Sequence, residues 1–125
     1  MNTIMVVDDE RDILSLIEKV LKKYHYIVEA YSDSVKALAS FLRDPSRYVL
    51  IITDIRMPGL SGTELSEKIW QKDPKKKIIF MTAYLAEEYR QTQLRVAISK
   101  RDIVEKPFSL ERICDEVRLR LPVNT

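Results

Sequence analysis

The sequence of 125 residues has a single cysteine, Cys114, and a single histidine, His25. One cysteine cannot form an internal disulfide, which is typical of proteins in a reducing compartment. The histidine lies in a predicted turn between two tyrosines, where we expect a structural or merely exposed side chain. No apolar run is as long as a membrane span, and no basic leader precedes the first apolar residues. We therefore expect a cytoplasmic protein without membrane contact.

An excess of one charge is also missing, since 21 basic and 19 acidic side chains leave a formal net charge of +2. This balance gives no reason to expect direct binding to nucleic acid. A short basic cluster at residues 75–77 is interpreted as a solvated turn rather than a partner-binding patch. The length predicts one domain with a sizeable core, here residues 1–125. Too few residues follow Lys106 to form an output domain, so none is expected.

Five apolar segments alternate with helical patterns along the chain. Strands are predicted at residues 3–8, 26–31, 49–54, 77–82 and 102–105. The first, third and fourth are continuous apolar runs, as central strands are, whereas the second and fifth carry charges that edge strands tolerate. Strict alternation favours a parallel sheet with helices on both faces. The predicted fold is α/β and flavodoxin-like, a doubly wound (βα)5 five-stranded parallel sheet in the order 2-1-3-4-5.

The helices are predicted from apolar residues that recur at helical spacing. They are expected after Asp9, near Asp33, from Gly62, around residues 86–97 and after Pro107. The fourth of these has the weakest periodicity. For the second helix, the pattern predicts an inward face made of Val35, Leu38, Ala39 and Leu42.

Polar side chains stand where the predicted strands end. They are Asp8 and Asp9 after the first strand, Asp54 on the third, Thr82 on the fourth and Lys106 after the fifth. Each has an ordinary structural explanation by itself, but the predicted fold brings all five to one edge of the sheet. Neighbouring carboxylates repel unless a cation compensates them, and all-oxygen ligation suits Mg²⁺, which often shares a phosphate. The strand ends therefore predict a magnesium site.

Four segments at these strand ends carry a resemblance that covers essentially the whole chain. They are VVDDE at residues 6–10, ITDIRMPGLSG at 52–62, MTAY at 81–84 and EKPF at 105–108. As a set they resemble the receiver domain of two-component response regulators. The resemblance implies that Asp54 accepts a phosphoryl group from a sensor histidine kinase or a histidine phosphotransfer protein. It also implies that Mg²⁺ is bound by Asp9, Asp54 and the backbone carbonyl of Arg56, with Asp8 helping directly or through water.

The same resemblance implies roles for the remaining strand-end residues. Lys106 would pair with one phosphoryl oxygen, the Thr82 hydroxyl would bind another, and the small Ala83 would leave room for the group. The peptide bond between Lys106 and Pro107 would be cis. The chain would catalyse only its own phosphotransfer and dephosphorylation, and would not be an enzyme for a separate substrate. Phosphorylation would switch its contacts with a downstream effector or output domain, and dimerisation is one form such a switch can take.

Three other functions are weighed against this one. A phosphatase of the haloacid-dehalogenase type needs a second acid two residues after its nucleophile, and that position is Arg56. A flavodoxin needs a hydroxyl-rich phosphate loop after the first strand, where the mainly acidic segment DDERD at residues 8–12 would repel phosphate. A receiver-like interaction domain that is not phosphorylated stays open, because kinase competence cannot be read from residues.

The switching residue of the family is absent from this sequence. Ile103 stands three residues before Lys106, at the position where the family carries an aromatic residue. The usual Gly-Ala pair before the fifth strand is also absent, and ISKRD stands in its place. An isoleucine has no hydroxyl that could exchange hydrogen-bond partners. We therefore expect phosphorylation to act on residues 82–89, where Tyr84 and Tyr89 are candidate substitutes.

Overall fold

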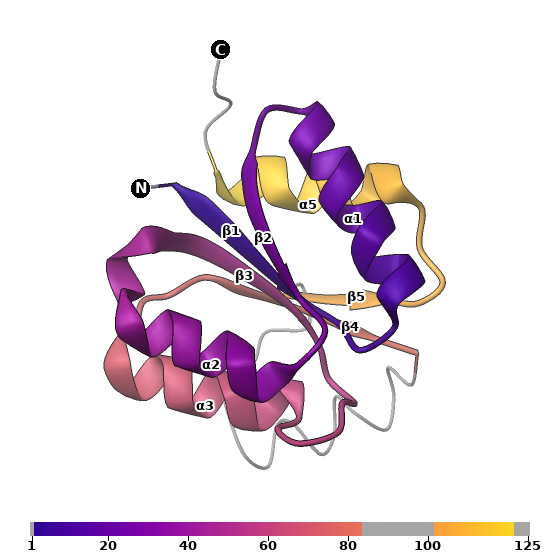
Figure 1. Cartoon of the computed structure of the whole chain (residues 1–125). Helices are drawn as coiled ribbons and strands as arrows, with labels where there is room; N and C mark the ends of the chain where they lie inside the picture. Colours follow the sequence, from indigo (N-terminus) through magenta and orange to yellow (C-terminus); the bar gives the residue numbers. More distant parts are fainter. Residues whose placement is uncertain (1, 84–101, 122–125) are drawn as a thin grey trace.

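Five parallel strands form the centre of the protein in the computed structural model, which describes residues 2–83 and 102–121 (Figure 1). They are β1 (Thr3–Val7), β2 (Ile27–Tyr31), β3 (Tyr48–Asp54), β4 (Ile78–Thr82) and β5 (Ile103–Glu105). Their order in the sheet is β2-β1-β3-β4-β5, and every neighbouring pair is parallel. This confirms the predicted fold and strand order, and each strand boundary lies within one residue of its prediction.

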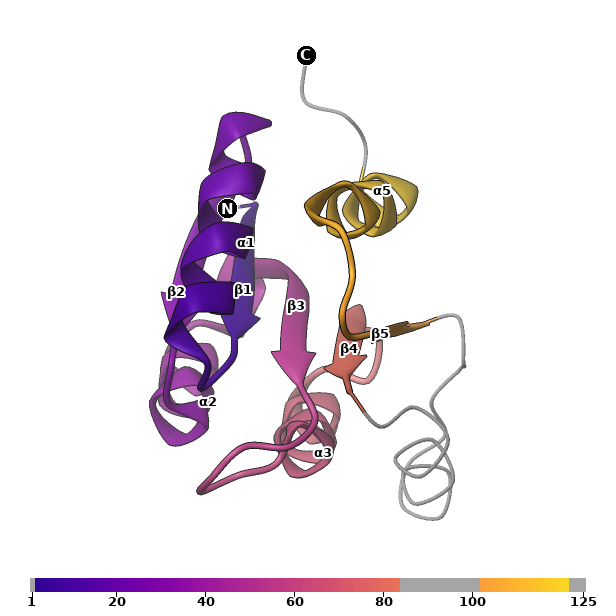
Figure 2. The same cartoon turned by 90° about the vertical axis from the view of Figure 1, so that its right-hand side faces the viewer.

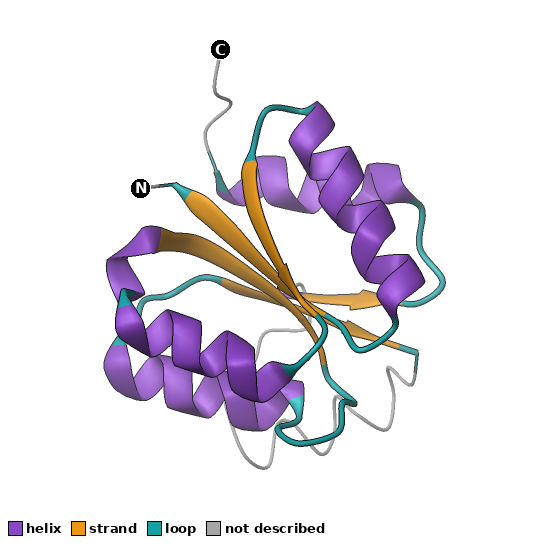
Figure 3. Ribbon diagram, in the orientation of Figure 1, coloured by secondary structure: helices purple, strands orange, loops and turns teal. Residues whose placement is uncertain are grey.

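Helices cover both faces of this sheet, as the alternating pattern predicts (Figure 3). They are α1 (Arg11–Lys23), α2 (Ser34–Arg43), α3 (Gly62–Lys72) and α5 (Leu110–Arg120), and a short 3₁₀ turn, η1 (Pro45–Arg47), precedes β3. Figure 1 shows α1 and α5 on one face and α2 and α3 on the other. The helix predicted around residues 86–97 lies outside the described residues.

The core consists of two apolar layers, one on each face of the sheet. Successive side chains of a strand point to opposite faces, so β1 contributes to both layers and all of its residues are buried. Ile4 and Val6 belong to the layer under α1 and α5, whereas Met5 and Val7 belong to the layer under α2 and α3. This two-sided burial explains the continuous apolar runs in the central strands.

The predicted inward face of α2 is wrong. Ala37 and Phe41 are fully buried, Leu38 is partly buried, and Val35 and Leu42 are 54% and 48% exposed. The Phe41 ring stacks on a tyrosine of β3 with 6.2 Å between ring centroids. The largest side chain of the helix thus points into the core, and this turns the positions on the other side of the helix toward solvent.

The basic cluster at residues 75–77 is also more than a solvated turn. The Lys76 side chain is only 9% exposed and pairs with Asp73 at 3.4 Å. Its ammonium donates to the backbone carbonyls of Pro45, at 3.2 Å, and of Tyr48. Lys77 donates to the carbonyl of Arg120 at the end of α5, at 2.8 Å. Through these hydrogen bonds to backbone carbonyls, the two lysines link the loop before β4 to the start of β3 and to the end of α5.

The single histidine is exposed, in agreement with the sequence-based expectation, and the single cysteine is buried. His25 lies exposed in the turn between α1 and β2, with a φ of 69°. Cys114 is buried in α5 against the apolar layer under α1. Within residues 2–83 and 102–121, no helix has the length and apolar character needed to cross a membrane.

Candidate functional site

The carboxyl ends of β1, β3, β4 and β5 meet at one edge of the sheet (Figure 2). Asp8 directly follows β1, Asp54 and Thr82 are the last residues of β3 and β4, and Lys106 directly follows β5. Pairing in register aligns these ends, since Asp54 lies opposite the residue before Thr82 in the next strand. Asp8, Asp54 and Thr82 are 0%, 7% and 1% exposed. The fold thus buries two carboxyl groups and a hydroxyl at one place.

A lysine ammonium lies at the centre of this group. Lys106 Nζ is 3.0 Å from Asp8 Oδ2, 3.2 Å from Asp54 Oδ2 and 2.9 Å from Glu10 Oε1. The lysine side chain is 10% exposed and that of Glu10 is 58% exposed. Two buried carboxylates and one exposed carboxylate therefore share one cation.

Backbone hydrogen bonds orient the same side chains. The amide of Glu10 donates to Asp8 Oδ1 at 2.9 Å, and the amide of Ile55 donates to Asp54 Oδ1 at 2.9 Å. The amide of Lys106 donates to the carbonyl of Thr82 at 2.7 Å, which joins β5 to β4 at the site. The peptide bond after Lys106 is cis, as the resemblance implies. Each carboxylate thus uses one oxygen for the backbone and presents the other to the lysine.

Burial is the main cause that raises the pKa of both aspartates. Burial, followed by the charge of Asp8, raises the pKa of Asp54 from 3.8 to about 6, against the opposing effect of Lys106. Burial also raises the pKa of Asp8. Burial alone would lower the pKa of Lys106, but hydrogen bonds to Glu10 and Asp8 outweigh it and the pKa is raised. One lysine does not balance these carboxylates, so the site favours a further cation.

The donor set suits magnesium. Carboxylate oxygens of Asp8, Glu10 and Asp54 all lie within 4.8 Å of one another. A hard cation such as Mg²⁺ prefers oxygen ligands of this kind and retains several waters. Asp9, which the sequence favours as a ligand, is exposed and lies outside this close group, although it lines the same pocket. Its proposed role as a ligand stays a prediction.

Glu10 is the residue that the sequence-based assignment missed. It follows Asp8 and Asp9 directly, so the signal was present as a third acidic residue in the run. Nothing in the local pattern says which of three consecutive acidic side chains turns toward Lys106, which lies 96 positions further along the chain. That choice depends on how the start of α1 approaches β5.

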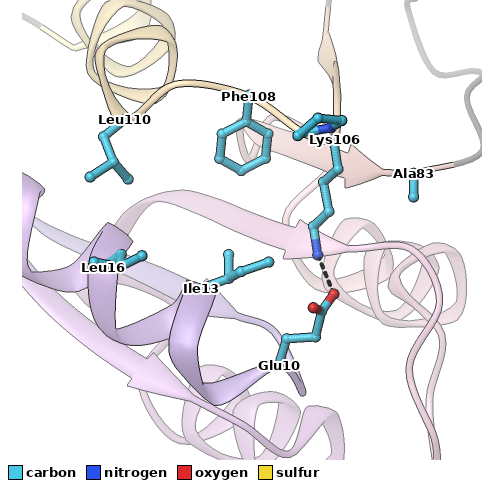
Figure 4. A pocket seen from close by; sticks show the side chains of 8 residues that line it. Glu10, Ile13, Leu16, Ala83, Lys106, Phe108 and Leu110 are labelled. Carbon is cyan, nitrogen blue, oxygen red and sulfur yellow. Dashed lines mark hydrogen bonds and ion pairs between the residues drawn. The ribbon is translucent and has the colours of Figure 1, made fainter.

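The site opens to solvent through a pocket of about 230 Å³. Its lining residues are Asp9, Glu10, Asp54, Arg56, Thr82, Ala83 and Lys106. All predicted site residues except the buried Asp8 therefore line one cavity. A second, more apolar pocket of about 410 Å³ adjoins it, with Glu10, Ala83 and Lys106 common to both (Figure 4).

The third helix begins unusually close to the aspartate that ends β3. Gly62 donates its amide to the carbonyl of Ile55 at 2.7 Å, and a Cβ on Gly62 would lie 2.1 Å from the Asp54 carbonyl oxygen. Ser61 and Glu64 form a capping box at this helix start. The glycine thus permits a close approach that fixes the loop between Asp54 and α3.

A family model described as the response regulator receiver domain matches residues 4–118. The chain belongs to this family. The acidic pocket of Asp8, Glu10 and Asp54 fits the phosphoacceptor site of such receiver domains in two-component systems.

Curated relatives of this receiver domain are response regulators. CpdR of Brucella abortus is 28% identical over 121 residues, which cover 97% of this chain and 98% of CpdR. VanR of Enterococcus faecium is 34% identical over 118 residues, covering 94% of this chain and 49% of VanR. The C4-dicarboxylate transport regulator DctD of Rhizobium meliloti is 27% identical, but the match covers only 24% of DctD. The chain spans about half the length or less of most of these relatives.

Solved structures of receiver domains have the same fold. The response regulator TrrA of Thermotoga maritima, solved in complex with Mg²⁺ and BeF, is 31% identical with a TM-score of 0.81, covering 97% of this chain and 100% of TrrA. The chemotaxis protein CheY4 of Vibrio cholerae is 25% identical with a TM-score of 0.83, covering 97% of this chain and 99% of CheY4.

Proposed function

We propose that this receiver domain takes a phosphoryl group from a phosphohistidine onto the side chain of Asp54. The observation that carries the proposal is the Asp54 carboxylate, which is buried at the inner end of an open pocket with a lysine ammonium 3.2 Å away. A carboxylate can act as the nucleophile in an acyl phosphate when cations neutralise the phosphoryl oxygens.

The transfer is an in-line displacement at phosphorus. An oxygen of Asp54 forms the new O–P bond while the N–P bond to the donor histidine breaks, and the imidazole leaves with the electron pair and takes up a proton. We propose that Lys106 and the hydroxyl of Thr82 each bind one oxygen of the transferred group. Such reactions depend on positioning and charge stabilisation more than on covalent work by the protein.

Receiver domains bind Mg²⁺ at an acidic site, and the oxygen donors of this pocket fit that ion. We propose Asp8, Asp9, Asp54 and the backbone carbonyl of Arg56 as its ligands, with Glu10 close enough to be considered as well. When bound, Mg²⁺ supplies positive charge that offsets the negative charge of the phosphoryl group.

The adjoining apolar pocket suggests where the phosphodonor docks. Ile13 and Leu16 of α1 face Phe108 and Leu110 across it, and the Lys106 side chain lies beside Phe108 and extends toward Glu10 (Figure 4). Leu16 is 50% exposed and adds to the apolar lining of this pocket, and contiguous apolar surface of this kind marks interaction sites. We propose that a sensor histidine kinase or histidine phosphotransfer protein covers this surface.

Receiver domains act with histidine kinases and often with output effectors. We propose that phosphorylation of this chain switches its contact with such an effector or output domain. The chain would catalyse only its own phosphorylation and dephosphorylation. We place the reaction in the cytoplasm, since sensor kinases make their phosphohistidine from ATP.

The test is incubation with acetyl phosphate and Mg²⁺, followed by intact-mass and peptide mass spectrometry. We expect one acid-labile and base-labile phosphoryl group at Asp54, absent from Asp54→Asn and present in the matched surface variant Asp12→Asn. A stable phosphate on serine or threonine, or equal labelling of Asp54→Asn, would contradict the assignment. Repeated turnover of a small phosphate ester would instead support a phosphatase.

A further inference from the structure

The ammonium of Lys106 is fully engaged before any phosphoryl group arrives. It has three N–H donors, and three carboxylates lie within hydrogen-bond distance. Its shortest contact, 2.9 Å, is to Glu10 rather than to the proposed phosphoacceptor Asp54 at 3.2 Å. Lys106 must therefore release a partner before it can bind a phosphoryl oxygen.

Glu10 differs from the two aspartates in its position. Asp8 and Asp54 approach Lys106 from the buried end of the strands, whereas the side chain of Glu10 is 58% exposed. Glu10 also lines both pockets, and Figure 4 shows its carboxylate joined to the Lys106 ammonium in the larger one. The carboxylate of Glu10 thus holds Lys106 from the side by which an anionic donor enters.

The backbone at Glu10 shows that its side chain is available for this contact. Glu10 occupies the N-cap position of α1 but makes no side-chain capping bond. By contrast, Asp33, Ser61 and Ser109 each cap their helices through the side chain. Glutamate is not a favoured N-cap residue, so α1 begins with a side chain that contacts Lys106 instead of the helix amides.

We propose that Glu10 is a positioning residue that restrains Lys106 and slows phosphorylation by small anionic donors. The inference rests on the proposed function of Asp54. It adds that the Glu10 carboxylate competes with the phosphoryl group for the ammonium of Lys106. An incoming phosphoryl oxygen has to displace the Glu10 carboxylate from the ammonium, and the two anions repel each other while they compete for it.

The test compares Glu10→Gln and Glu10→Asp with the wild-type protein. Glutamine keeps the length of the side chain but removes the charge, whereas aspartate keeps the charge and is one methylene too short to keep the contact. Since the Glu10 side chain is 58% exposed, its ion pair with Lys106 is partly screened by water. We therefore expect phosphorylation by acetyl phosphate at saturating Mg²⁺ to be about two- to fivefold faster in both variants. Asp12→Asn removes the same charge from the first turn of α1 and should leave the rate unchanged.

A second measurement follows binding rather than transfer. The affinity for beryllofluoride, titrated by calorimetry at saturating Mg²⁺, should rise by a similar factor in Glu10→Gln. A slower reaction with weaker Mg²⁺ binding would show that Glu10 is a metal ligand, and an unchanged rate would show that it restrains nothing. Faster phosphorylation of Glu10→Gln but not of Glu10→Asp would show that the negative charge at position 10 repels the donor from a distance. That result would overturn the proposal that Glu10 competes with the phosphoryl group for Lys106. If wild-type Asp54 is not labelled, the proposed function fails, while the beryllofluoride titration still tests Glu10.

Discussion

Replacing Asp54 by asparagine should make the metal-free protein more stable at pH 8, although it removes the proposed phosphoacceptor. The Asp54 side chain is buried beside Asp8, and the two carboxylates share one lysine with Glu10. Asparagine has nearly the same shape, and its side-chain oxygen can still accept the hydrogen bond from the Ile55 amide. The substitution therefore removes a poorly compensated charge with little change in packing.

The magnitude follows from the pKa of Asp54. A value of about 6 in the folded protein, against 3.8 normally, means that ionised Asp54 costs about 3 kcal/mol of folding free energy. This cost already includes the attraction of Lys106. Asparagine does not reproduce every contact of the protonated acid, so we expect a gain of about 1–3 kcal/mol. For a domain of this size, each kcal/mol corresponds to a rise in Tm of roughly 3–6 °C.

The gain should depend on pH in a defined direction. Above pH 6, Asp54 is ionised in both the folded and unfolded wild-type protein, and the full cost applies. As the pH falls through 6, the folded protein takes up a proton at Asp54 before the unfolded chain does, which stabilises the wild type. The advantage of Asp54→Asn should therefore shrink between pH 6 and pH 4 and vanish below about pH 3.8.

The assay is urea and thermal unfolding in the presence of a chelator at pH 8, 6 and 4, with Asp12→Asn as a surface control. Millimolar Mg²⁺ should stabilise the wild type more than Asp54→Asn, because a ligand of the native state adds RT ln(1 + [L]/Kd) to stability. An Asp54→Asn protein less stable than the wild type at pH 8 without metal, or a gain that does not change with pH, would refute the electrostatic argument.

Two further substitutions test residues that stabilise the structure around the site and at the start of β3. Gly62→Ala should destabilise the protein by at least about 2 kcal/mol and slow phosphorylation of Asp54, because the added Cβ would lie 2.1 Å from the Asp54 carbonyl oxygen. Unchanged stability in urea denaturation and unchanged labelling of Asp54 would show that the loop adjusts freely. Lys76→Met should lower the free energy of unfolding by about 1–3 kcal/mol, because it removes the hydrogen bonds from the ammonium to two backbone carbonyls. The same substitution at the exposed neighbour, Lys75→Met, should change the free energy of unfolding little. Equal effects of the two substitutions in urea denaturation would contradict the structural role of Lys76.

Local patterns in the sequence were enough to predict the sheet and the residues at its edge. A strand buried on both faces needs apolar residues at every position, and this requirement is visible in the sequence itself. Alternation of strand and helix then implies parallel strands whose carboxyl ends share one edge. Asp8, Asp54, Thr82 and Lys106 could therefore be placed together before any coordinates were known.

Contacts between distant side chains were beyond such reasoning. The inward face of α2 was predicted wrongly because Val35 and Leu42 fit an apolar stripe, yet packing of the Phe41 ring on β3 decides the rotation of the helix. The basic cluster looked like a solvated turn, yet Lys76 reaches carbonyls 28 and 31 residues earlier in the chain.

The sequence by itself determined the fold class, the strand order and the identity of the strand-end residues, because periodicity and burial are properties of neighbouring positions. Only the tertiary structure decided that Glu10, rather than Asp9, joins Asp8 and Asp54 around Lys106. Three consecutive acidic residues are equivalent as a pattern. They differ once the first turn of α1 is packed near the end of β5, since a side chain of fixed length reaches the ammonium from one backbone position and not from the next.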